Sequence, residues 1–199
     1  MKSVVQANMS NKKNLFNEKT FIVWLFIVAS TMLFLAFSSA YWVHKTDGVN
    51  NKAWFVFELP FQFWVSTAIV AVSSVFMQLA FKAAKNDDVY KVPSLLTITL
   101  VLGIGFAVSQ ISAWISMTNQ GFYFSNKNPG EISISFLYVI PGVHLVHILG
   151  GLILLIVGIV KASRLEIHKK NLTFIQICKT YWHFLGIVWI FLILFLYFA

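Results

Sequence analysis

Two histidines, His144 and His147, stand three residues apart in the apolar stretch PGVHLVHILGG at residues 141–151. Their imidazoles could ligate haem or a metal, pass protons, or make hydrogen bonds inside the protein. Residues three apart lie on the same side of a helix, so the two rings cannot take opposite axial positions on one haem. A zinc or copper site would need further ligands nearby. The pattern favours an internal hydrogen-bonded pair, with ligation and a proton relay as open alternatives.

The composition is that of a membrane protein. Of the 199 residues, 58% are hydrophobic and only 11% are charged, whereas soluble domains carry about a quarter charged residues. The single cysteine, Cys178, excludes an internal disulfide and a thiolate cluster for zinc or iron–sulfur. No metal site is therefore expected in this chain.

Five apolar segments are each close to the roughly 20 residues that cross the hydrocarbon core of a bilayer. None carries Asp, Glu, Lys or Arg in its interior. They predict an all-α, polytopic bundle of five transmembrane helices over residues 21–199, after a polar segment at 1–20. The first segment is longer than a signal-peptide core and follows this polar segment, so we expect it to be retained. The predicted spans are 21–43, 59–81, 95–117, 135–160 and 182–198.

The basic residues are divided unevenly between the two sides of such a bundle. Twelve of the 15 lie in the N-terminal segment and in the second and fourth connections, and three lie in the first and third. Because cytoplasmic loops carry the excess of Lys and Arg, the N-terminus is predicted to be cytoplasmic and the C-terminus outside. The net charge of +8 then reflects topology, and no nucleic-acid partner is expected. This reading places Cys178 in the last cytoplasmic connection, just before the fifth span.

Small and polar residues recur at helical spacing within the predicted spans. Small residues let helices approach closely in lipid, and hydroxyls and amides can bond across the contact. His144, His147 and Gly151 share one stripe, in which Gly151 would bring a neighbouring helix close to the imidazoles. These stripes favour helix packing over a polar path for a substrate. Similar stripes are Gln62, Ser66 and Ser73 in the second span and Gly103, Ala107, Gln110 and Trp114 in the third.

The absence of acidic residues from the spans limits the chemistry that the chain can perform. Transporters of protons or cations generally keep a buried carboxylate. No nucleophile–base pair, phosphate-binding loop or HExxH motif is present, and no catalytic residue is assigned. A structural subunit of a larger assembly is favoured. The alternatives are a membrane anchor that binds b-type haem through His144 or His147 together with His183, and a small membrane transporter.

Four stretches of the sequence carry a family resemblance. PGVHLVHILGGLILLIVGIVKA contains the pattern H-x-x-H-x-x-x-G, and YWHFLGIVWIFLILFLYF opens with Tyr-Trp-His-Phe. The other two are ELPFQFWVSTAIVAVSS and LGIGFAVSQISAW. In this order they resemble the helices of subunit III of haem–copper terminal oxidases (cytochrome c oxidase polypeptide III), in its five-helix form. The resemblance covers roughly residues 20–198.

The resemblance implies a non-catalytic accessory subunit of a proton-pumping terminal oxidase of the aerobic respiratory chain, in a bacterial inner membrane. The oxidase would reduce O2 with electrons from cytochrome c or a quinol, with haem and copper in partner subunits. This chain would carry no such cofactor. It would pack against subunit I and stabilise it, associate with subunit II and further subunits, and bind phospholipid.

The resemblance also indicates a cluster of polar or lipid-contacting residues without acids. Thr31, in VASTMLFLAF, stands where family members often have Glu after Ser. Ala113 and Gly186 stand at two further positions where acids are common in the family. The cluster expected from the motifs is His144, His147, Gly151, His183, Trp182 and Thr31.

Overall fold

The computed structural model of the chain describes residues 18–50, 61–119, 132–169 and 171–198. These residues form five α-helices and, apart from one isolated antiparallel bridge, no β-structure. Each helix contains a stretch long and apolar enough to cross a membrane, so the predicted all-α fold with five spans is confirmed. The polar segment at 1–20 lies almost wholly outside the described residues. The helices are α2 (Glu18–Asn50), α3 (Phe61–Lys85), α4 (Lys91–Asn119), α5 (Ile132–Ser163) and α6 (Thr173–Phe198).

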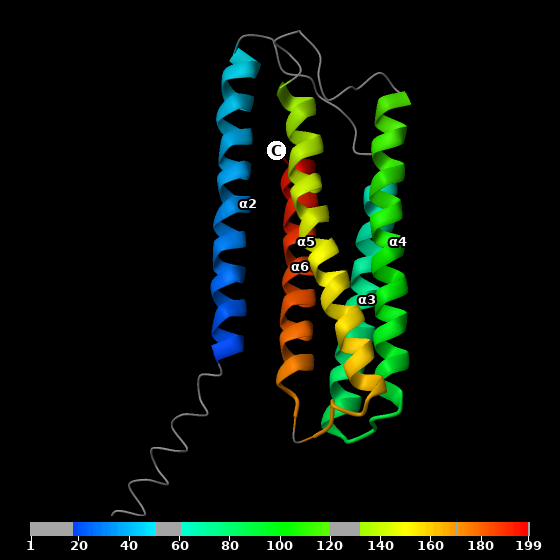
Figure 1. The fold of residues 1–199 in the computed structure, drawn as a ribbon. Coiled ribbons are helices and arrows are strands. Elements are labelled where there is room, and N and C mark those ends of the chain that lie inside the picture. Colours follow the sequence, from blue (N-terminus) through cyan, green and yellow to red (C-terminus); the bar gives the residue numbers. More distant parts are fainter. Residues whose placement is uncertain (1–17, 51–60, 120–131, 170, 199) are drawn as a thin grey trace, which may run out of the picture.

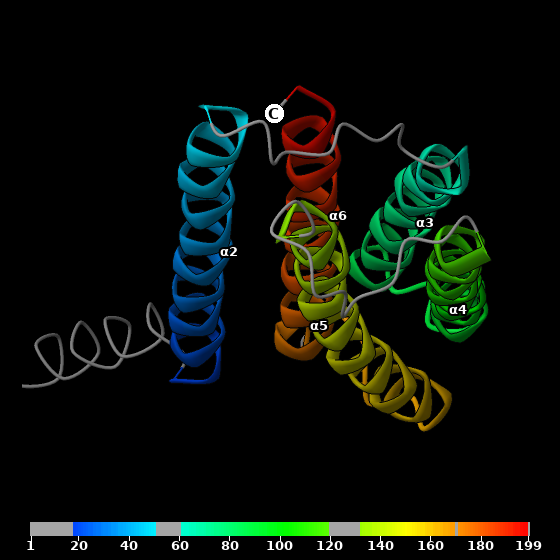
Figure 2. The same ribbon diagram turned by 90° about the horizontal axis from the view of Figure 1, so that it is seen from above.

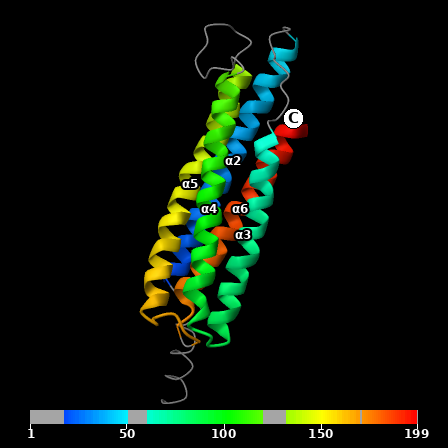
Figure 3. The ribbon, with the colours of Figure 1, turned by 90° about the vertical axis from the view of Figure 1, so that its right-hand side faces the viewer.

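Successive helices run in opposite directions, so the α3–α4 turn and the α5–α6 loop lie at the same end of the bundle, the lower end in Figure 1. Seen from above, α5 and α6 occupy the middle, with α2 on one side and α3 and α4 on the other (Figure 2). The side view in Figure 3 shows α3 and α4 side by side along their length. The lower end is the one that the basic residues predict to face the cytoplasm, and we call it the predicted cytoplasmic end.

α6 is the most buried helix, and α2 is the most peripheral. In the most apolar 18 residues of each span, 50% of the α6 residues are buried inside the chain, against 17% in α2. α2 packs chiefly against α5 and α6. Its outward side chains, such as Ile22, Trp24 and Met32, are exposed and apolar. The position of α2 therefore depends on a small set of contacts with the two central helices.

α6 begins at Thr173, well before the predicted span at 182–198. Lys179, which had indicated a connection, lies within the helix with its Nζ 3.9 Å from the centroid of the Phe81 ring. An apolar stem and an aromatic ring allow a lysine to lie near the end of a span. The placement of Cys178 in a connection is therefore wrong, because this thiol is inside α6 and only 3% exposed.

At the predicted cytoplasmic end, α3 and α5 finish in the same kind of cap. The amides of Asp88 and Glu166 each bond to the carbonyl five residues earlier, at 2.9 and 3.0 Å, as in the Schellman motif. The preceding residues, Asp87 and Leu165, adopt positive φ angles of 66° and 58°. The amide of Lys169 donates to the Asp87 carboxylate at 3.1 Å. This bond ties the α5–α6 loop to the α3–α4 turn.

We expect a membrane-impermeant maleimide to label Asn119→Cys but not Asn86→Cys in intact cells, with the buried Cys178 replaced by Ser. Asn86, in the α3–α4 turn, and Asn119, the last residue of α4, are both exposed and lie at opposite ends of the bundle. The distribution of basic residues places Asn86 in the cytoplasm. Opening the cells should make both sites reactive, which is the control. Labelling of Asn86→Cys in intact cells would reverse the orientation.

Candidate functional site

His147 joins α5 to α2 through its side chain. Its Nδ1 lies 2.8 Å from the carbonyl oxygen of Val143, and its Nε2 lies 3.2 Å from the hydroxyl of Ser30 on α2. A carbonyl oxygen only accepts, so Nδ1 carries the hydrogen in the neutral ring and Nε2 accepts from the Ser30 hydroxyl. Both ring nitrogens are thereby used in contacts within the chain.

Aromatic contacts surround this hydrogen bond. The Phe34 ring of α2 lies 5.3 Å from the His147 ring and 6.0 Å from the His144 ring, measured between centroids. Phe26 lies 5.8 Å from His147 and 5.9 Å from Tyr181 of α6. The Tyr181 hydroxyl donates to the carbonyl oxygen of His147 at 3.1 Å. α2 is thus attached to both central helices at the level of the histidines.

His144 lies one turn away from His147 and is fully buried. Its ring stacks on the Trp189 indole of α6, with centroids 5.3 Å apart and planes at 29°. The Phe106 ring on α4 makes a T-shaped contact with it, with centroids 5.9 Å apart and planes at 77°. Neither ring nitrogen of His144 has a hydrogen-bond partner among the described residues. The contacts of His144 are therefore aromatic packing contacts, which join α2, α4, α5 and α6.

Two tryptophans seven residues apart on α6 donate hydrogen bonds to hydroxyls of α3. The Trp182 indole donates to Ser73 and the Trp189 indole donates to Thr67, each at 3.1 Å. Residues seven apart lie on the same face of a helix about two turns apart, so the two indoles form successive layers. Each layer gives a buried N–H group the partner that a hydrocarbon environment cannot supply.

Trp182 lies between two glycines on neighbouring helices. A Cβ atom built on Gly103 of α4 would lie 2.7 Å from the Trp182 ring, and one on Gly151 of α5 would lie 3.2 Å from it. The absence of side chains at these two positions leaves the space that the indole fills. At Gly151 the neighbouring helix is α6, whose Trp182 and Leu185 side chains lie against this position.

α3 and α4 form a third polar contact. The Gln110 amide donates to the Ser66 hydroxyl at 2.8 Å, and the Ser109 hydroxyl donates to the carbonyl oxygen of Gln62 at 3.2 Å. The Gln110–Ser66 bond connects the stripes of the second and third predicted spans. These polar groups therefore hold two helices together.

The site has the chemistry of packing rather than of catalysis. None of the five spans contains Asp or Glu. Within the described part of the chain, no three His, Cys, Asp or Glu side chains gather closely enough to hold a metal ion. The indole, hydroxyl and amide groups listed above bind one another across helices. Such contacts position helices but supply no proton-binding carboxylate.

The amino-acid sequence matches the family described as "Cytochrome c oxidase subunit III" over residues 4–199. The chain belongs to the cytochrome c oxidase subunit III family. It is similar to cytochrome c oxidase subunit 3 of Corynebacterium diphtheriae, with 26% identity over 94% of this chain and 90% of the relative. It is also similar to the cytochrome bo(3) ubiquinol oxidase subunit 3 of Pseudomonas aeruginosa, with 29% identity over 84% of this chain and 78% of the relative.

As a member of the subunit III family, the chain is an accessory subunit of a haem–copper oxidase and an integral membrane protein. The resemblance to this family that the motifs predict is confirmed. The relative from Bacillus sp. strain PS3, also a cytochrome c oxidase subunit 3, is 27% identical over 85% of this chain. Relatives named for cytochrome c oxidase and for ubiquinol oxidase are thus similar to this subunit III chain to nearly the same degree.

Four of the six expected cluster residues lie in interhelical contacts: Gly151 packs against Trp182, and His144 and His147 both contact the Phe34 ring. Thr31 is on an exposed face of α2, where its hydroxyl donates to its own helix at the Ile27 carbonyl, 2.8 Å away. His183 is only partly buried and lies on a different face of α6 from its neighbour Trp182. Neither takes part in the interhelical contacts described above.

The contacts also depend on residues outside the expected cluster. Ser30 provides the α2 hydroxyl that meets His147, and Phe34 provides the ring between the two histidines. Trp189 forms the second indole layer. Its spacing of seven from Trp182 is a signal of a shared face. The sequence offers no comparable signal for choosing Ser30 over Thr31.

Gly103→Ala should lower the stability of the chain by about 1–3 kcal/mol, the usual cost of overpacking a filled core. The new methyl group would collide with the Trp182 ring, which the Ser73 bond and Gly151 hold in place. Gly105→Ala on the same helix is the matched control, because a Cβ there has no neighbour within 4 Å. Denaturant unfolding in detergent measures both. Equal stability of the two variants would contradict the close packing of the Trp182 ring against Gly103.

Ser30→Ala should weaken the attachment of α2 by about 0.5–1.5 kcal/mol, whereas Thr31→Ala should change stability by less than about 0.5 kcal/mol. The first removes a side-chain hydrogen bond between α2 and α5, and the second removes a bond within α2. Amide hydrogen exchange of α2 in the purified oxidase measures the difference. Faster amide exchange of α2 in Thr31→Ala than in Ser30→Ala would show that Thr31, and not Ser30, attaches α2.

Proposed function

We propose that this chain is a structural subunit that packs against subunit I of its oxidase and holds a phospholipid acyl chain in a groove beside α2. The haem and copper of the oxidase then lie in partner subunits, and this chain supplies no catalytic group. Association with subunit II and further respiratory subunits follows from the same role. The bacterial relatives support a location in the bacterial inner membrane.

A groove between α2, α5 and α6 carries this proposal. It has a volume of about 280 Å³ and almost entirely apolar walls. The Tyr181 hydroxyl, which also lines the groove, already donates to the His147 carbonyl. The walls therefore offer contacts to a hydrocarbon chain rather than to a polar ligand. The lining residues are Ile22, Val23, Phe26, Gly150, Leu154 and Tyr181.

The environment of the histidines supports packing over the two alternative functions. A haem on His144 would need the space that the Trp189 and Phe106 rings occupy. Both nitrogens of His147 already bond to groups of the chain. A transporter of cations would require a charged or titratable path, and the spans contain no acid. The same features suit a subunit whose work is to stabilise its partners.

The chain is similar both to relatives named for cytochrome c oxidase and to relatives named for ubiquinol oxidase, and this bears on its role in the oxidase. The cytochrome c oxidase and ubiquinol oxidase relatives differ by name in their electron donor, yet they are similar to this chain to nearly the same degree, at 26% and 29% identity. A role for this chain in choosing the donor would be expected to separate the two groups. This similarity supports a role in stabilising the partner subunits rather than in choosing the electron donor.

Gly150→Leu should fill the groove, so that the purified oxidase retains less phospholipid and loses activity sooner during turnover. Gly150 lines the groove, and a Cβ there would meet only the Tyr181 hydroxyl at 3.6 Å. Gly105→Leu, at an open position on α4, adds the same side chain elsewhere. Both variants should co-purify with a haem-containing subunit through a tag on this chain. Unchanged phospholipid content and active life in Gly150→Leu would contradict lipid binding in the groove. Absence of haem from the tagged wild-type preparation would contradict the association with a haem-containing subunit.

A further inference from the structure

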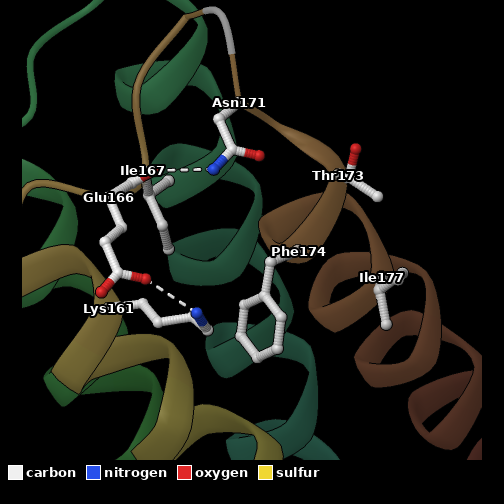
Figure 4. A pocket seen from close by; sticks show the side chains of 7 residues that line it. All are labelled: Lys161, Glu166, Ile167, Asn171, Thr173, Phe174 and Ile177. Carbon is white, nitrogen blue, oxygen red and sulfur yellow. Dashed lines mark hydrogen bonds and ion pairs between the residues drawn. The ribbon is translucent and has the colours of Figure 1, made fainter. Parts of the chain in front are cut away.

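A second cavity lies at the predicted cytoplasmic end, between the end of α5 and the start of α6 (Figure 4). It encloses about 240 Å³, many times the roughly 30 Å³ that one water molecule takes up in the liquid. It is separate from the groove beside α2 and shares no lining residue with it. Its walls are Lys161, Glu166, Ile167, Asn171, Thr173, Phe174 and Ile177.

A charge pair forms the polar wall of this cavity. The Lys161 ammonium donates to the Glu166 carboxylate at 2.7 Å, and the two side chains are 39% and 41% exposed. This bond holds the pKa of the Glu166 carboxyl below its usual range, so the carboxylate is charged at neutral pH. An ammonium has three donors and a carboxylate has two oxygens, so each keeps capacity for a second partner. The cavity thus presents one positive and one negative group side by side.

The loop that carries Glu166 is fixed by hydrogen bonds. The Asn171 side chain donates to the Glu166 carbonyl at 3.0 Å, and the Asn171 amide donates to the His168 carbonyl at 2.7 Å. The Lys169 amide bonds to Asp87 in the neighbouring turn. A binding site held in this way loses less conformational entropy when it takes up a ligand.

The remaining walls are apolar and lead into the membrane. Phe174 and Ile177 lie in the first turns of α6, and the Lys161 Nζ is 5.7 Å from the Phe174 ring centroid. The two adjoining spans end at Ser163 and begin at Thr173. The cavity is therefore at the level of the lipid headgroups, with its charges toward water and its apolar wall toward the hydrocarbon core.

We infer that this cavity binds the headgroup of a zwitterionic phospholipid with a primary ammonium, of the phosphatidylethanolamine type. Its phosphate would accept from Lys161, and its ammonium would donate to Glu166. An anionic lipid such as phosphatidylglycerol has no donor cation for the carboxylate and would be repelled by it. Phosphatidylcholine carries a quaternary ammonium without N–H groups, so it cannot donate a hydrogen bond. The site would select its lipid by this pair of charges.

The test uses the intact purified oxidase, stripped of exchangeable lipid in detergent and titrated with one phospholipid at a time. Native mass spectrometry counts the bound lipid molecules. Binding at this cavity is the difference between the number bound to the wild type and the number bound to each variant. Phosphatidylethanolamine should bind to the wild-type site about tenfold more tightly than phosphatidylglycerol or phosphatidylcholine, the effect of one charge-assisted hydrogen bond. Glu166→Gln should remove this preference, and Lys161→Gln should weaken binding of all three lipids.

Three controls make the result specific. Lys91→Gln and Asp88→Asn alter the other exposed ion pair at the same end, 3.1 Å long and outside the cavity, and should change nothing. Lys161→Glu combined with Glu166→Lys restores both charges in exchanged positions and should recover the preference for phosphatidylethanolamine. Millimolar inorganic phosphate should not displace the lipid.

Tighter binding of phosphatidylglycerol than of phosphatidylethanolamine would overturn the inference, because the cavity would then be a general anion site. Displacement by inorganic phosphate would overturn it in favour of a free phosphate ligand. Unchanged phosphatidylethanolamine binding in both single variants would show that the pair plays no part. None of these outcomes bears on the groove beside α2, which Gly150→Leu tests separately.

Discussion

The bundle depends on the packing of one tryptophan. The Trp182 ring fills the space between Gly103 on α4 and Gly151 on α5, and its N–H group bonds to Ser73 on α3. In a lipid environment the hydrophobic effect does not drive helices together, so close packing and interhelical hydrogen bonds must do so. A single side chain of α6 supplies close packing to α4 and α5 and a hydrogen bond to α3. The burial of α6, the small residues at the two facing positions and the hydroxyl on α3 are all consequences of this placement.

The two histidines make different kinds of interhelical contact. His147 uses both nitrogens and connects α5 to α2, whereas His144 uses its ring faces and packs against Trp189. The ring nitrogens of His144 have no partner among the described residues. A buried polar group without a partner typically lowers the stability of a protein by about 1–3 kcal/mol. The aromatic contacts with Trp189 and Phe106 offset part of this loss. One H-x-x-H pattern therefore serves two separate physical roles, and neither resembles ligation.

Much of this arrangement is predictable from the sequence, because span length and helical spacing are local properties. The number of spans, the helix class and the packing role of Gly151 follow from them. The pairing of helices does not, since it depends on groups far apart in the chain. Ser30 and Thr31 are adjacent hydroxyls, and only the direction from which α5 approaches decides that Ser30 meets His147. The start of α6 was misplaced for a related reason, because Lys179 lies over the Phe81 ring of another helix.

The distribution of charge suits the proposed place of this chain beside a proton-pumping partner. All the contacts described between its spans are made by neutral groups or by lysine near a span end, and its two described ion pairs lie at the predicted cytoplasmic end. Moving one elementary charge through the membrane potential changes its energy by about 2.3 kcal/mol per 100 mV. Because no acid lies within the spans, a membrane voltage has no carboxylate there on which to act. On the proposed function, the contacts that hold this subunit together are therefore independent of the gradient that its partners build.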